Sequence, residues 1–350
     1  MSIRNTINTF AIIVLSLIIF VVAVAPSQAY ADTIPDSGYL SGRVIFLDPG
    51  HDEETGNYYA DYSEHVTMLV LAEKIKPRLE ELGATVYLTR DSEKRKSSEV
   101  RCAFINKCAI EAVKEARLYN DEKADVGEID RLISIMQSII GDPKLAEIYM
   151  NTPYDPKRTI HPDQARILEL ENDDEILSRF LFISLHSDAS SNLGENGACA
   201  FYISTVDKVV RTYYNNIPYS SYSELSKDFG DIILDHIAGT GLNNLGSIAD
   251  NFFMIREHNL PGVLVENGYH TNSADRARLQ NDDFLEILAD AYADAVVEYF
   301  SAIPLPTRFT EPVVIEAEAE EPEEEPEDDT DDPVVEDKYE IKRVILYSAR

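Results

Sequence analysis

A short apolar run that ends in a sharp turn is the feature that most constrains how this chain can fold. Residues 44–47 are all apolar, which is typical of a strand buried on both faces of a parallel sheet. Asp48-Pro49-Gly50 ends the run, because proline lacks a backbone donor and glycine permits unusual φ angles. His51 follows at once, and in open α/β sheets ligands bind beyond the carboxyl ends of the strands. His51 is therefore a candidate for chemistry.

The next segment completes a βαβ unit. Ser63 is a suitable N-cap for an amphipathic helix, in which Pro77 predicts a kink or an early stop, and Gly83 ends it. Residues 84–89 form a second strand, and such a unit requires parallel strands joined by a right-handed crossover. Further strands are expected at 180–185, 198–204, 252–256 and 263–265, and helices at 97–119, 128–140, 163–178, 222–238 and 282–302. The sequence predicts a single α/β domain over residues 43–303, with a mostly parallel central sheet flanked by helices.

The two ends of the chain differ from this domain in composition. Residues 1–31 have the pattern of a signal peptide, and residues 32–42 form a linker. An uncleaved anchor is the alternative, but the apolar run has 16 residues and a membrane span needs about 20. Residues 304–350 are predicted to be a disordered acidic tail, since 311–337 alone contain 15 acidic residues. We expect export to the periplasm or the cell surface, without a stable membrane anchor after cleavage.

Charge and cysteine content exclude two other classes of protein. The formal net charge is −32 and no basic stripe is present, so nucleic acid is not an expected partner. Three cysteines cannot build a disulfide framework, and none belongs to a CxxC pair that would suggest a metal site. We expect Cys102, Cys108 and Cys199 to be free thiols.

Three separate predicted strands end on a group that can bind metal or move protons. These groups are His51, His186 and Glu266, and parallel strands bring their carboxyl ends to one edge of the sheet. Glu64, at the start of the first helix, can reach the same edge. Two histidines and one carboxylate form the ligand set of a catalytic zinc ion with one open position. The remaining glutamate would then serve as a general base in the hydrolysis of an amide.

Six segments carry a family resemblance in their order along the chain. They are VIFLDPGH, Glu64, VYLTRD, Arg101 with Asn106, FISLHSDAS, and GVLVENGYHTN followed by Asp275. Over about residues 43–300 the chain resembles the zinc-dependent N-acetylmuramoyl-L-alanine amidases, catalytic domains that remove stem peptides from peptidoglycan.

The resemblance assigns a role to each group at the sheet edge. It implies that His51, Glu64 and His186 bind Zn²⁺ and that Glu266 is the catalytic carboxylate. It also implies cleavage of the amide between N-acetylmuramic acid and L-alanine, with peptidoglycan as the partner through its stem peptide and muramic acid. The sequence leaves open whether an activator protein is a further partner. The alternatives are an inactive peptidoglycan-binding or regulatory protein on the same fold, or another zinc peptidase or deacylase.

The chain departs from the family pattern at two places. Asp52-Glu53 follows the DPGH run where a second glycine is common, which predicts a more acidic first loop that alters substrate fit. Asn106 and His186 are 80 residues apart, so residues 107–178 are expected to form an inserted helical subdomain. This insertion is either surface bulk or a lid over the zinc cleft.

The other histidines are expected to be structural. His65 adjoins Glu64, so on a helix its side chain points about 100° away. His270 lies four residues after Glu266, but the strand context argues against a helical zinc motif and leaves a substrate contact as its alternative role. The remaining ones are expected at the surface or in structural positions: His161, His236 and His258.

Overall fold

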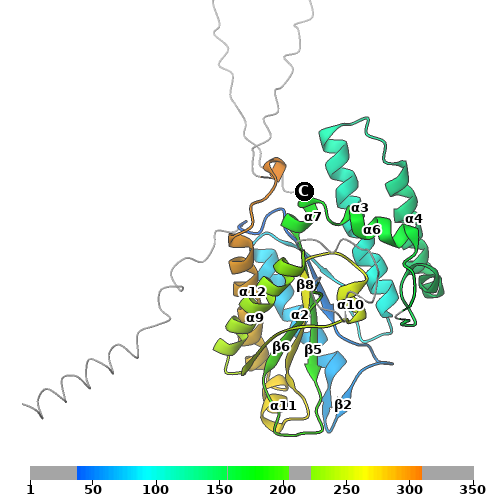
Figure 1. Cartoon of the computed structure of the whole chain (residues 1–350). Helices are drawn as coiled ribbons and strands as arrows, with labels where there is room; N and C mark the ends of the chain where they lie inside the picture. Colours follow the sequence, from blue (N-terminus) through cyan, green and yellow to red (C-terminus); the bar gives the residue numbers. More distant parts are fainter. Residues whose placement is uncertain (1–37, 156, 205–221, 310–350) are drawn as a thin grey trace, which may run out of the picture.

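A six-stranded sheet organises the part of the chain that the structure, a computed structural model, describes: residues 38–155, 157–204 and 222–309 (Figure 1). The strand order is β4-β1-β5-β8-β6-β7. The first four strands are parallel, β6 is antiparallel to β8, and β7 is parallel to β6. The bounds are β1 (Val44–Pro49), β4 (Thr85–Leu88), β5 (Phe180–Asp188), β6 (Ala198–Tyr202), β7 (Asn244–Ala249) and β8 (Gly262–Tyr269). The predicted mostly parallel sheet is confirmed.

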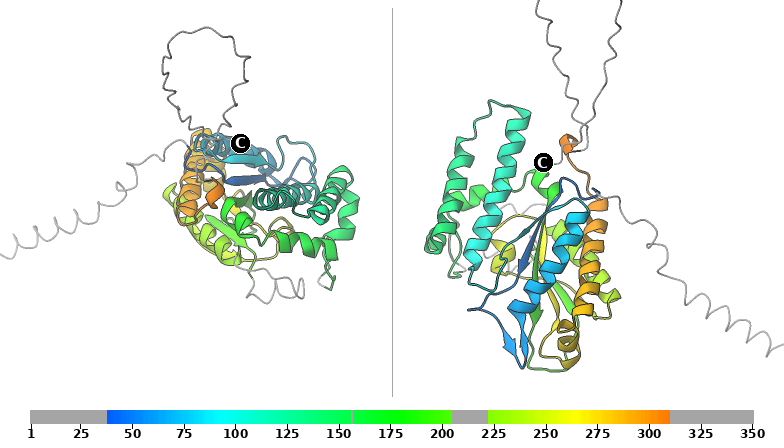
Figure 2. Two further views of the ribbon diagram at one scale, coloured as in Figure 1. Left: turned by 90° about the horizontal axis from the view of Figure 1, so that it is seen from above. Right: turned by 180° about the vertical axis from the view of Figure 1, so that it is seen from behind.

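Helices cover both faces of the sheet, as the view from above in Figure 2 shows. One face is covered by α2 (Glu64–Glu81), α9 (Tyr222–Gly239) and α12 (Asp282–Ser301). The other is covered by α3 (Ser98–Asn120), α6 (Pro162–Leu170), α7 (Asp174–Arg179) and α10 (Phe253–Arg256), and α4 (Gly127–Gly141) packs against α3. The shorter elements are β2 (Tyr58–Tyr59), β3 (Tyr62–Ser63), η1 (Pro143–Leu145), α5 (Ala146–Tyr149), α11 (Ser273–Leu279) and η2 (Thr307–Phe309).

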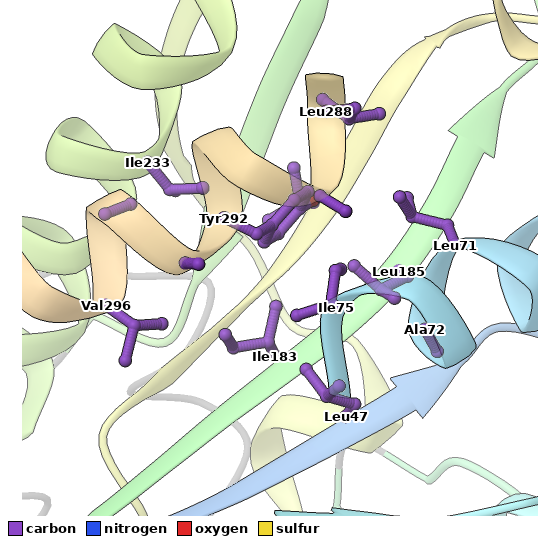
Figure 3. Packing of buried hydrophobic residues seen from close by; sticks show 14 of the residues in the cluster. Leu47, Leu71, Ala72, Ile75, Ile183, Leu185, Ile233, Leu288, Tyr292 and Val296 are labelled. Carbon is purple, nitrogen blue, oxygen red and sulfur yellow. The ribbon is translucent and has the colours of Figure 1, made fainter. Parts of the chain in front are cut away.

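Alternate strand residues separate two apolar cores. Ile45 and Leu47 face the α2 side, whereas Val44 and Phe46 face the α3 side. Figure 3 shows the first core, in which Ile183 of β5 lies between helices α2 and α12. This alternation decides which side chains at the strand ends can meet. Asp48, Ser184, His186 and Glu266 continue the series that faces α3.

Several predicted elements need correction. Residues 252–256, expected as a strand, contain the short helix α10, because an apolar run this short fits a buried helix turn as well as a strand. The outer strand is β7, which was not predicted because its sequence, NLGSIA, has no continuous apolar run and its residues are partly exposed. The helix expected at 163–178 is broken into α6 and α7. Pro77 lies within α2 and does not end it.

The predicted ends of the domain are only partly described. The signal peptide 1–31, most of the linker and residues 310–350 lie outside the described residues. Residues 304–309, which we assigned to the acidic tail, instead pack on the domain: the guanidinium of Arg179 lies 4.0 Å from the ring centroid of Phe309, and Arg308 pairs with Glu175. Among the described ranges, no helix is both long and apolar enough to cross a bilayer.

Candidate active site

The carboxyl ends of β1, β5 and β8 meet at one edge of the sheet, and the candidate residues lie there. His51 follows β1, and the register pairs His186 of β5 with Glu266 of β8. Glu64 is the first residue of α2, after the β2–β3 hairpin. Laterally paired residues of a sheet point to the same face, so His186 and Glu266 both face α3.

His51, Glu64 and His186 bring together three atoms that can bind a metal. The carboxylate of Glu64 lies between the rings, with Oε2 at 3.3 Å from His51 Nε2 and Oε1 at 3.0 Å from His186 Nδ1. Each residue offers one donor atom within 4.8 Å of the others. Imidazole nitrogens and a carboxylate oxygen are the donors that Zn²⁺ takes in catalytic sites, so the donor set fits that ion.

Glu64 is positioned by neighbours on both of its oxygens. Asn57 Nδ2 donates to Oε2 at 2.9 Å, and the backbone N–H of Ser187 donates to Oε1 at 3.1 Å. Burial alone would raise the pKa of Glu64, but hydrogen bonds from His186 and His51 outweigh it and lower that pKa well below its usual range. The group therefore remains an anionic donor while it is 1% exposed.

Glu266 has the opposite electrostatic environment. Burial, and then the charges of Glu64 and Asp188, raise the pKa of Glu266 well above its ordinary value. Its Oε2 is enclosed and has no hydrogen-bond partner among the residues that the structure describes. Cys199 of β6 flanks Glu266 in the register, and burial together with Glu266 raises the pKa of this thiol to about 12. An unpaired carboxyl oxygen beside a metal-binding triad is suited to hold or move a proton.

Two buried arginines fix the turn that carries His51. Arg90 donates to the carbonyls of Pro49 at 2.8 Å and of Gly50 at 3.0 Å. Arg101 donates to the carbonyls of Pro49 and His51 and pairs with Asp48 at 3.2 Å. His51 has φ +59°, a left-handed conformation that is unfavourable for a residue with a side chain. The hydrogen bonds from Arg90 and Arg101 hold the backbone in this conformation.

Gly50 is required at the turn by close packing. A Cβ at this position would lie 2.4 Å from Cε1 of His186, so a side chain would displace the imidazole ring. The Gly50 N–H also donates to the carbonyl of Leu185 at 2.8 Å, which joins the turn to β5. The DPGH run therefore positions both histidines.

Asp52 has a structural role that differs from our expectation. It is 2% exposed, and its carboxylate accepts hydrogen bonds from the backbone of Glu54, Thr55 and Lys96. The acidic residue after the turn thus shapes the loop instead of offering a free charge to a substrate.

A family model described as N-acetylmuramoyl-L-alanine amidase matches residues 45–118 and 148–298. The match covers the sheet and every candidate site residue. The chain belongs to this family. Residues 119–147, which include α4, are not matched.

Similar proteins are known from bacteria. The "Probable cell wall amidase LytH" of Staphylococcus aureus is 25% identical over 161 residues, which are 44% of this chain and 49% of that protein. The chain thus spans about half the length of the curated relatives it matches. The catalytic domain of CwlV from Bacillus (Paenibacillus) polymyxa var. colistinus is 20% identical with a TM-score of 0.45, covering 75% of this chain and 99% of that one. The CwlD amidase of Clostridioides difficile, in complex with the GerS lipoprotein, is 18% identical with a TM-score of 0.45, covering 74% and 99%.

Contacts within the protein hold several of the histidines outside the candidate triad, among them His65. Its ring bonds to Ser63 Oγ at 3.0 Å and is 2% exposed. His270 stacks on Tyr62 at 5.2 Å and contacts Ser187 Oγ at 3.0 Å, so it packs behind Glu64. His258 is buried, and burial lowers its pKa to about 3.

The sequence analysis missed the roles of several residues that support the site. Arg90 and Asn57 were not singled out, because an arginine or asparagine in a loop gives no signal of its target. Asn106 was part of the resemblance without a role, and it donates to the carbonyl of Glu257 at 2.9 Å. These contacts join segments that are distant along the chain.

A cavity of about 340 Å³ opens beside the triad. Its lining includes His51 and His186, and its opposite wall is formed by the first turn of α3. Within the described residues, nothing from 107–178, the predicted insertion and candidate lid, lines it. Beyond its first turn, α3 packs side by side with α4 (Figure 1).

Proposed function

We propose that this chain is an exported, zinc-dependent N-acetylmuramoyl-L-alanine amidase that cleaves the bond between N-acetylmuramic acid and L-alanine in peptidoglycan. The observation that supports this most is the convergence of one donor atom each from His51, Glu64 and His186 within 4.8 Å, in a chain that belongs to the amidase family. The Staphylococcus aureus relative is a probable cell wall amidase, which supports action on the cell wall. Export would use residues 1–31 as a signal peptide.

The triad would hold the zinc ion at the carboxyl edge of the sheet. When bound, zinc polarises a carbonyl and activates water for attack at neutral pH. Glu64 stays charged because its neighbours lower its pKa, and Asn57 and Ser187 fix its orientation. Arg90 and Arg101 hold the backbone on which His51 is presented. Together they keep the triad in one geometry before substrate binds.

Glu266 would move the proton of the reaction. Its Oε2 takes a proton from the attacking water and then returns it to the leaving nitrogen of L-alanine. A raised pKa suits the first step of this role, because it strengthens the carboxylate as a proton acceptor. The neighbouring negative charges of Glu64 and Asp188 favour the protonated form between the two steps.

The rival function is an inactive peptidoglycan-binding or regulatory protein on the same fold. It would need neither the triad nor an enclosed, unpaired carboxyl oxygen. Burying such an oxygen costs stability without any return unless a reaction uses it. The residues therefore favour the enzyme over the binding protein.

Purified peptidoglycan distinguishes the two functions. We expect the wild-type protein to release new N-terminal L-alanine, to bind one zinc ion, and to lose activity with a chelator. Glu266→Gln should keep zinc and lower the rate by about 10²–10⁴-fold. Glu195→Gln, an exposed change in the loop after β5, is the matched control and should be fully active. Zinc-loaded protein that releases no L-alanine termini would exclude the amidase.

A further inference from the structure

A second cavity, of about 430 Å³, lies beside the triad cavity. The two share Ser98 and Glu99 in their linings, so one continuous wall runs from the metal-binding residues past the first turn of α3. The far end of the second cavity is lined by two segments that are distant in sequence: Asn151, Thr152 and Tyr154, and Asn251, Phe253 and Arg256.

Glu99 lies where the two cavities join and carries an unmatched negative charge. Its Oε1 accepts one hydrogen bond, from Thr152 Oγ1 at 2.9 Å. Among the described residues it forms no ion pair, in contrast to Glu54, which pairs with Arg95. A partly buried carboxylate without a cation favours binding of a positively charged ligand group.

The side of the second cavity opposite Glu99 does not supply a cation that could pair with this carboxylate. Arg256 lines the second cavity but is 3% exposed and pairs with the buried Glu257 at 3.0 Å. Arg256 also donates to the carbonyl of Asn151, which holds this segment in place. The guanidinium of Arg256 on this wall is therefore already paired with a carboxylate.

The lining of the second cavity also suits the methylene groups of an aliphatic side chain. Tyr154 is 54% exposed, and Phe253 lies beside it on α10, each near the guanidinium of Arg256. Aromatic faces bind methylene groups while a charged end reaches a polar partner. An amine on an aliphatic chain matches both parts of the lining.

We infer that this second cavity binds a stem-peptide residue with a free side-chain amine, and that Glu99 determines the specificity for it. The inference rests on the proposed amidase function, since the scissile amide would lie at the triad. An extended peptide advances by about 3.3–3.6 Å per residue. A residue farther along the stem than L-alanine would then reach the adjoining cavity.

Two soluble muramoyl peptides test this specificity. They differ only in the third stem residue, which is lysine in one and Nε-acetyl-lysine in the other. We expect the wild-type enzyme to prefer the lysine peptide by about tenfold in kcat/KM, which equals about 1.4 kcal/mol. Glu99→Gln should lose the preference through KM, because glutamine keeps the acceptor for Thr152 but not the charge. Glu99→Lys should reverse it, and Glu111→Gln, at a different position on α3, should change nothing.

Calorimetric binding of the two released stem peptides separates this inference from the proposed function. Preferential binding of the lysine peptide that is lost in Glu99→Gln supports the amine site, even if neither substrate is cleaved. Cleavage of both substrates at equal rates, with equal binding by wild-type and Glu99→Gln proteins, overturns the amine site and leaves the amidase intact. The preference should also weaken at high salt, because Glu99 is partly exposed.

Discussion

The two faces of the central sheet are built from the same strands but differ in chemistry. The face toward α2, α9 and α12 is an apolar core that includes Ile45, Leu47, Ile183 and Leu185. The face toward α3 begins with an apolar core and continues into buried charged groups at the strand ends, where Asp48 pairs with Arg101. Alternation along one strand thus assigns neighbouring residues to stability on one face and to the candidate site on the other.

The two candidate carboxylates, Glu64 and Glu266, also differ in their electrostatic surroundings. Glu64 is buried and Glu266 is half-buried, yet the pKa of Glu64 is lowered and that of Glu266 is raised. The difference comes from their surroundings: two histidines contact Glu64, whereas burial and then the negative charges of Glu64 and Asp188 act on Glu266. One carboxylate is therefore suited to bind a cation and the other to carry a proton.

The largest effect is expected from breaking the ion pair on the α3 face. Arg101→Met leaves Asp48 buried without its cation and removes donors to Pro49 and His51. We expect a loss of about 3–5 kcal/mol in the free energy of unfolding, measured by urea denaturation, and loss of zinc binding. Arg95→Met, which breaks an exposed pair in the same cavity lining, should cost less than about 1 kcal/mol. Equal losses of stability in the two variants would show that the buried ion pair on the α3 face matters no more than an exposed one.

The apolar face should affect stability without affecting chemistry. Ile183→Ala creates a cavity between β5 and the helices α2 and α12 (Figure 3), at an expected cost of about 2–4 kcal/mol. Turnover per folded molecule should stay unchanged, because the residues of β5 at the site, Ser184 and His186, face α3. Ile287→Ala, at a position 52% exposed on α12, is the control and should be close to neutral. A fall in turnover per folded molecule would show that the faces are coupled.

Gly50→Ala should disturb the site more than the fold. The added Cβ would lie 2.4 Å from the ring of His186, so the imidazole must move. We expect zinc affinity to fall by about 10–100-fold, measured by competition with a chelator, with a small change in unfolding temperature. Gly141→Ala on α4 meets no atom within 4 Å and should leave zinc affinity unchanged. Unaltered zinc affinity in Gly50→Ala would refute the packing argument.

The smallest effect on the candidate site is expected from a change to a buried carboxyl group on the α3 face that the site does not use. Burial raises the pKa of Glu171 from 4.5 to about 8, against a hydrogen bond from Asn259 N–H. Between these values the native state holds a proton that the unfolded chain has released, so stability falls as pH rises from about 4.5 to 8. Glu171→Gln should remove this slope and raise the free energy of unfolding above pH 8 relative to the wild-type protein. Glu169→Gln, at an exposed position nearby, should keep the slope.

Much of the fold could be predicted from the sequence because its signals are local. Apolar runs marked β1, β4, β5, β6 and β8, and the 3.6-residue period marked the long helices. Local signals failed where tertiary contacts choose the structure. The short run at 252–256 became α10, and β7, which has no continuous apolar run, formed because β6 offered it an edge to pair with.

For the candidate site, the sequence by itself determined which groups lie at or near the carboxyl ends of the buried strands: His51, His186 and Glu266. Strand polarity then required them to meet at one edge, since parallel strands share the direction of their carboxyl ends. Only the tertiary structure decided how each group is tuned. Arg101, Glu64 and Glu99 act on partners tens of residues away, and such contacts depend on packing that no local pattern encodes.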